Sequence, residues 1–169
     1  APNEWHSRHA RRLIQERVAA GKIAEDAGLA LLFNDEMPKP EVFTVPQRIR
    51  QLSTLAHFVE PGRIQKFAEM VTAKSLTDVD PRLTAFAIRI ASQGTSQAPE
   101  SIQRRAEVER DSKSQIVRLG LASSLSRTAL NDRWTILEGL ISHAEDAKDH
   151  NLPLMYWYAA ESLVEHDPV

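Results

Sequence analysis

The sequence predicts an all-α protein, a right-handed α-α superhelix of about nine helices in roughly 4.5 helical hairpins. Apolar residues recur at spacings of three and four, and no segment sustains the alternation of a half-buried strand. Several of the nine prolines stand where a first helical turn begins. Alternate helices also repeat the same order of core residues. Together these patterns predict a single helical repeat domain over residues 1–169.

Helix starts are marked by proline and by capping patterns. Four prolines fall in first turns, where the missing N–H costs nothing and the fixed φ favours the helix. These are Pro46, Pro81, Pro99 and Pro153. Capping-box patterns pair Thr44 with Gln47 and Ser112 with Gln115. With apolar spacing, they predict helices over 4–20, 22–34, 45–59, 62–74, 80–93, 98–111, 113–126, 129–146 and 152–166.

Two of these helices differ most in their apolar faces. The helix over 129–146 is the clearest amphipath, with one apolar row at spacings of four and three. That row is Leu130, Trp134, Leu137, Ile141 and Ala144. By contrast, the segment Glu100–Asp111 has little apolar character besides Ile102, Ala106 and Val108. It is expected to be a solvated outer helix.

A repeat relates alternate helices. The same core position recurs at separations of 42, 35, 35 and 38 residues. Its occupants are Ala10, Leu52, Ala87, Ala122 and Ala160. A period of this size with two helices per period is typical of helical-hairpin solenoids. We therefore expect these five residues to lie in the core between helices.

The clearest copy of the repeat runs from Asp111 to Leu125. It resembles the second helix of a HEAT repeat, in which a turn Asp precedes a Val-Arg pair and then Ala and Leu core positions. In that family the turn Asp and the helix Arg form a ladder of bonds between neighbouring repeats. The resemblance implies this structural role for Arg118, with ligand binding as the alternative. Gly120 inside the helix fits a close approach of two helices, at a cost of ~1 kcal/mol relative to Ala.

Three stretches carry a more specific resemblance, namely EWHSRHARRLIQER at 4–17, RWTILEGLISHAED at 133–146 and DHNLPLMYWY at 149–158. They resemble the HEAT-containing middle region of large bacterial proteins classed as membrane-bound dehydrogenases, where a β-propeller precedes the helices and a haem c domain follows. The resemblance implies a helical connector from a larger exported parent, periplasmic or membrane-associated. A helix signal directly after Ala1-Pro2 also favours a fragment of a larger protein.

Composition excludes several kinds of site. The chain has no cysteine, so this segment can hold no disulfide, thiolate zinc site, cysteine nucleophile or covalent haem c, and we expect no cofactor. Its 21 basic and 23 acidic residues give a net charge of −2, without the basic excess typical of nucleic-acid coats. No nucleic acid partner is therefore expected. No apolar run approaches the ~20 residues of a membrane span, so no membrane insertion is expected either.

A polar cluster lies between the last two predicted helices. Its members are His143, Glu145, Asp146, Asp149 and His150. Histidine and carboxylate groups bind metals and carry protons, but this spacing matches neither His-Glu-x-x-His nor an EF-hand loop. We interpret the cluster as a structural turn, with Asp149 or Asn151 capping the last helix and His143 near the end of the previous one. A partner-binding surface and a metal or catalytic site are the alternatives.

The last helix carries the aromatic run Tyr156-Trp157-Tyr158. Consecutive helix residues fan by about 100°, so the three rings cannot all point inward. We expect them to form an interaction surface or to pack on a neighbouring domain, because aromatic residues are enriched at interfaces.

The first predicted helix is basic. Its cationic and histidine residues are His6, Arg8, His9, Arg11, Arg12 and Arg17. HEAT-like enzymes that excise alkylated bases hold DNA on a cationic face, which makes a DNA-binding or glycosylase-type role the alternative function. The leading expectation is a non-catalytic helical scaffold whose partners are other domains of the parent or another protein.

Overall fold

The computed structural model describes residues 4–24, 43–56, 80–93 and 99–166, which contain seven α-helices, one 3₁₀ helix and no strand. The all-α prediction is confirmed for these residues. The expected helix over 62–74 lies outside the described residues. So does most of the one over 22–34, of which residues 22–24 are not helical. The described helices are therefore fewer than the nine expected.

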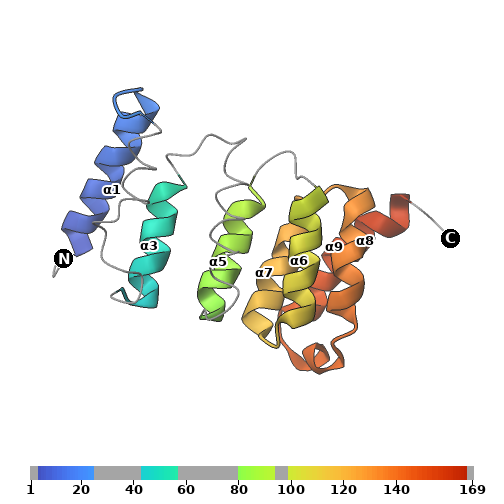
Figure 1. Cartoon of the computed structure of the whole chain (residues 1–169). Coiled ribbons are helices and arrows are strands. Elements are labelled where there is room, and N and C mark those ends of the chain that lie inside the picture. The colour runs from blue at the N-terminus through green and yellow to red at the C-terminus, as the bar shows by residue number, and fades with distance from the viewer. Residues whose placement is uncertain (1–3, 25–42, 57–79, 94–98, 167–169) are drawn as a thin grey trace. The chain divides into compact units, whose positions relative to one another are not determined.

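Contacts divide the chain into an N-terminal unit, Ala1–Arg63, and a C-terminal unit, Ile64–Val169. The N-terminal unit contains α1 (Glu4–Ala19) and α3 (Val45–Leu55), drawn in blue and cyan in Figure 1. The helices of the C-terminal unit follow in green to red. They are α5 (Pro81–Ala91), α6 (Pro99–Asp111), α7 (Gln115–Leu125), α8 (Leu130–Ile141), the 3₁₀ helix η2 (Ala144–Lys148) and α9 (Leu152–His166).

The helix starts follow the local signals in most places. Asp80 caps α5 by accepting a bond from the Arg82 backbone N–H at 3.0 Å, and Pro81 opens that helix. At α3, the Thr44 backbone N–H donates to Gln47 Oε1 at 2.8 Å, as the capping pattern predicts.

The second predicted capping box is wrong. Ser114, not Ser112, is the N-cap of α7. Ser112 Oγ instead accepts from the Ser114 N–H at 3.3 Å. Gln115, the first residue of α7, does not bond back to the N-cap. Its side-chain amide donates to Asp146 Oδ1 at 3.3 Å instead.

Within the C-terminal unit, alternate helices lie side by side. α5 packs on α7 and α7 packs on α9, while α6 packs on α8; α8 also contacts α7 and α9. The buried side chains between these rows form one cluster. It comprises Ile88, Ile102, Val108, Val117, Leu121, Ala122, Leu125, Ile136, Leu137, Leu140, Leu152, Tyr156 and Ala159.

α7 approaches α5 closely at Gly120. A Cβ built at Gly120 would lie 3.1 Å from both Cα and Cβ of Ala85. The expected close helix–helix approach is therefore confirmed, and it explains a glycine in a helix interior.

The apolar row predicted for α8 is only partly buried. Its member Leu137 is fully buried, but Trp134 and Ile141 are each 50% exposed. The buried face is completed by Ile136 and Leu140, which are not in that row. The helix is apolar over much of its circumference, so two rows satisfied the spacing. Packing against α6, α7 and α9 selects the row that contains Ile136. The helix also ends at Ile141, earlier than the predicted 146, in a tight last turn where Ser142 and His143 bond three residues back.

Candidate functional site

The turn between α8 and α9 is ordered by its own backbone and by Asp149. After α8 the chain forms η2 and then enters α9. Asp149 Oδ1 accepts bonds from the backbone N–H groups of Asn151 at 2.8 Å and Leu152 at 2.9 Å. Bonds from the Leu152 and Asn151 backbone lower the pKa of Asp149. Of the two cap candidates in the sequence, Asp149 is the one that caps α9.

Asp146 is the buried centre of this turn. Arg118 on α7 forms two parallel bonds with it, from Nε to Oδ2 and from Nη2 to Oδ1, both 2.6 Å. The Tyr156 hydroxyl on α9 donates to Oδ2 at 2.7 Å, and Gln115 Nε2 donates to Oδ1 at 3.3 Å. Two carboxylate oxygens thus join α7, the turn and α9.

The electrostatics of Asp146 follow from its bonds. Burial raises the pKa of Asp146, but the bonds from Arg118, Tyr156 and Gln115 outweigh burial and lower it to about 2. Burial and the neighbouring Asp146 carboxylate raise the pKa of Tyr156 well above its usual range. The bond to Asp146 raises the pKa of Arg118. The ion pair is therefore charged across the physiological range, and both side chains are only 1% exposed.

His143 faces outward from the same turn and contacts two carboxylates. Its Nε2 lies 2.9 Å from Glu109 Oε1 on α6, and its Nδ1 lies 2.9 Å from Glu145 Oε1. Only a doubly protonated ring can donate to both oxygens. The pKa of Glu145 is lowered, first by a bond from its own backbone and then by the bond to His143. His143 thus connects α6 to the turn.

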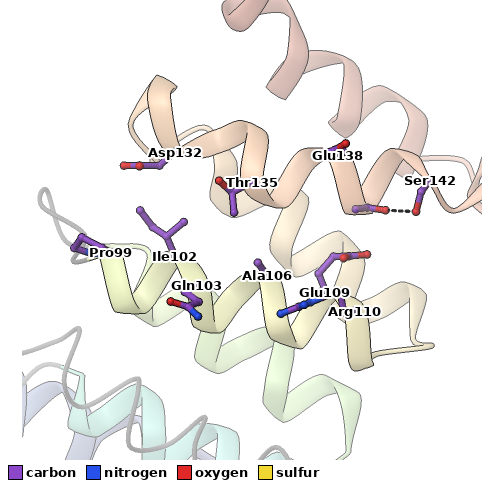
Figure 2. Close-up of a pocket in the computed structure, with 11 residues that line it drawn as sticks. Pro99, Ile102, Gln103, Ala106, Glu109, Arg110, Asp132, Thr135, Glu138 and Ser142 are labelled. Carbon is purple, nitrogen blue, oxygen red and sulfur yellow. Dashed lines mark hydrogen bonds between the residues drawn. The ribbon is translucent and has the colours of Figure 1, made fainter.

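A groove of about 710 Å³ lies between α6 and α8 beside Glu109. Figure 2 shows Ile102 and Ala106 pointing from α6 toward α8. The Ser142 hydroxyl donates to the Gly139 carbonyl at 2.6 Å. A Cβ at Gly139 would overlap the Glu109 carboxylate, so glycine makes room for that group. The lining residues are Pro99, Ile102, Gln103, Ala106, Glu109, Arg110, Asp132, Thr135, Glu138, Gly139 and Ser142.

The structure distributes the five residues of the predicted polar cluster. Asp146 points inward to α7 and α9, Asp149 caps α9, and Glu145 meets His143 and lies 3.4 Å from Arg118 Nη2. His150 is exposed. Within the described part of the chain, no three histidine or acidic side chains converge as a metal site would require. Asp149 forms the helix cap of the structural interpretation, whereas Asp146 and His143 bond to residues on other helices.

The three aromatic residues of α9 separate in the same way. Trp157 and Tyr158 are 58% and 55% exposed, as an interaction surface requires. Tyr156 is buried, which corrects its placement on that surface. It lies on the helix face of Leu152 and Ala159, where its hydroxyl reaches Asp146.

The predicted core positions hold best in the C-terminal unit. Ala87 and Ala122 are buried and Ala160 is half-buried against the core cluster. Leu52 is half-buried, and Ala10 is exposed, so its assignment to the core is wrong. α1 has no buried residue because arginine and other polar side chains occupy most of its circumference.

Glu109 is a site residue that the sequence reasoning missed, and Arg105 is a second buried charged residue on the same helix. Both are 4% exposed, although their helix reads as solvated. Arg105 Nη1 lies 3.1 Å from Ser124 Oγ and from Thr128 Oγ1, and burial lowers its pKa to about 10. Spacing contains a signal: Arg105 and Glu109 stand three and seven residues after Ile102, on the same helix face.

Comparisons with protein-family models, with characterised proteins and with solved structures returned no significant match. No helix in the described residues is both long and apolar enough to cross a membrane.

Proposed function

We propose that the chain is a non-catalytic helical scaffold, a HEAT-like solenoid of roughly 4.5 repeats within a larger, exported protein of redox type. Its role is to hold a protein partner or neighbouring domains of the parent. The side-by-side packing of α5, α7 and α9 and of α6 and α8 supports a repeat of two-helix units.

The bond between Arg118 and Asp146 supports the same proposal. It links α7 to the turn that precedes α9, the position at which consecutive hairpins meet. In HEAT repeats an arginine–aspartate ladder has this place. Both charged groups bond to each other and hold helices together, as expected of residues in a structural scaffold.

The observation that carries the interaction role is an apolar row on α9. Leu154 and Trp157 stand three residues apart and are each at least 50% exposed, on the helix side opposite Leu152 and Ala159. Val164, 65% exposed, follows on the same side beyond Glu161. Tyr158 borders this row and is also exposed. Clustered exposed apolar side chains of this size mark contact surfaces, and Trp and Tyr are the side chains most often central to them.

The proposal is tested by photo-crosslinking in the cells that make the protein. A crosslinking amino acid at position 157 should give one discrete adduct, with another polypeptide or with a further part of the same one. The same amino acid at Asn131, an exposed residue of α8, serves as the matched control. Identical adduct patterns at both positions would contradict a contact surface on α9.

A further inference from the structure

The N-terminal unit contains a cationic pocket between its two described helices. Arg8, Arg11, Arg12 and Gln15 follow one another at spacings of three, one and three, so they share one face of α1. With Ser53 and Thr54 of α3, they line a pocket of about 320 Å³. An ion pair between Glu4 Oε1 and Arg50 Nη1, 2.5 Å apart, joins the same two helices.

The lining offers hydrogen-bond donors. Among the described residues it consists of three guanidinium groups, the Gln15 amide and the Ser53 and Thr54 hydroxyls, without a carboxylate, and the Thr54 hydroxyl donates to the Arg50 carbonyl at 2.8 Å. Arg11 Nε donates to the Ser7 carbonyl at 3.3 Å and Arg12 Nε donates to Glu16 Oε1 at 2.7 Å. Both bonds use Nε and fix the guanidinium planes, so their terminal Nη groups can donate to a ligand.

Charge on this face is unbalanced. Three guanidinium groups lie within one helical turn, and the Glu16 carboxylate bonded to Arg12 balances one of them. Like charges three or four residues apart on a helix, such as Arg8 with Arg11 and Arg12, repel one another. An anion bound between them would remove this repulsion and gain charge-assisted bonds.

We propose that this pocket binds the phosphate group of a small phosphorylated molecule. A guanidinium fork matches two phosphate oxygens at once, and three forks on one face suit a dianion with several acceptor oxygens. The pocket volume lies at the lower end of the range for small-molecule sites. A duplex nucleic acid needs cations spread along its backbone, whereas the three guanidinium groups of this pocket lie within one turn of α1.

The test is calorimetric titration of the full chain with inorganic phosphate and with glycerol phosphate in low-chloride buffer. We expect saturable one-site binding to both. The Arg8→Gln/Arg12→Gln variant should bind about tenfold more weakly or worse, because each lost charge-assisted bond is worth that much. Arg17→Gln is the matched control, since Arg17 is exposed on the same helix but does not line the pocket. Circular dichroism should show the same helix content in all three proteins.

Two further titrants distinguish the source of the phosphate, namely vesicles containing phosphatidic acid and a short duplex DNA. Saturable binding of free phosphate with selective loss in the double variant supports the proposal. Vesicle binding added to that pattern identifies a lipid headgroup as the source. Binding of DNA or vesicles without binding of either small phosphate would overturn it in favour of an extended polyanion. The proposal would also be overturned if phosphate binding did not saturate, or if Arg17→Gln weakened phosphate binding as much as the double variant does.

Discussion

Asp146 accepts bonds from three side chains on two helices, and one of the three is the buried guanidinium of Arg118. The Nη1 of Arg118 is buried without a hydrogen-bond partner in the described residues, so the ion pair already leaves one donor unmet. Breaking such a pair by neutralising one member costs more than the pair contributes, because the other charge stays buried. The stability of this turn therefore depends mainly on the Asp146 carboxylate.

Asp146→Asn should destabilise the protein by about 3 kcal/mol at neutral pH, because it leaves the Arg118 charge buried without its partner. The difference should depend on pH. The pKa of Asp146 is about 2 when folded and near 3.8 in its ordinary state, so its contribution is complete above pH 4. That contribution is lost as pH falls toward 2, and the stabilities of the two proteins should converge. Urea unfolding between pH 7 and pH 2 measures this.

Glu138→Gln is the control for that experiment, since Glu138 is an exposed carboxylate on α8. Its stability should stay within about 0.5 kcal/mol of the parent protein throughout. A pH-independent gap between Asp146→Asn and the parent would show that shape, not charge, accounts for the role of Asp146.

At the scale of helices, contact distance between α5 and α7 is set by two small residues. Gly120 faces Ala85 with no room for a further methyl group. Ala would normally be favoured over Gly in a helix interior by ~1 kcal/mol. Here the nearest atoms include the Ala85 backbone, which cannot turn aside as a long side chain could.

We predict that Gly120→Ala destabilises the C-terminal unit by about 1 kcal/mol, because overpacking exceeds the gain in helix propensity. Ala85→Gly alone should also destabilise, through its cost in helix α5. The double variant Ala85→Gly/Gly120→Ala should be more stable than the sum of the two changes predicts, since one methyl group replaces the other. Chemical unfolding of the four proteins gives this coupling directly. Simple additivity would mean that the two residues do not limit the approach of α5 and α7.

At the scale of the whole C-terminal unit, one core cluster extends from Ile88 on α5 to Ala159 on α9. Ala122 lies within it on α7, the helix that contacts both α5 and α9. Because the cluster is continuous, disruption at its centre should be felt by every helix of the unit.

Ala122→Glu should abolish cooperative melting of the C-terminal unit, because it buries a carboxylate without a partner at a position that is 2% exposed. Ala129→Glu is the matched control: Ala129 is exposed at the start of α8, where an acidic side chain is tolerated. Thermal melting followed by near-ultraviolet circular dichroism reports the loss. A melting temperature within a degree or two of the parent would contradict the burial of Ala122 and the phase of the repeat.

The sequence by itself determined the helical class, the described helix starts at Pro46, Pro81, Pro99 and Pro153, and the cap at Asp149. These features depend on local backbone chemistry, which residue type and spacing encode directly. Ala87 and Ala122 were also predictable as core residues, because the repeat phase fixes a helix face. Gly120 likewise signalled a close approach before its partner was known.

Only the tertiary structure decided which apolar row of α8 is buried, that Ala10 is exposed, and that Tyr156 separates from Trp157 and Tyr158. It also decided the bonding partners of Arg118, His143 and Glu109. Arg118 bonds to Asp146, 28 residues further along the chain, and His143 bonds to Glu109, from which it is separated by 34 residues. Helical spacing specifies the direction of a side chain but not the element it meets, because that depends on how helices distant in sequence pack together.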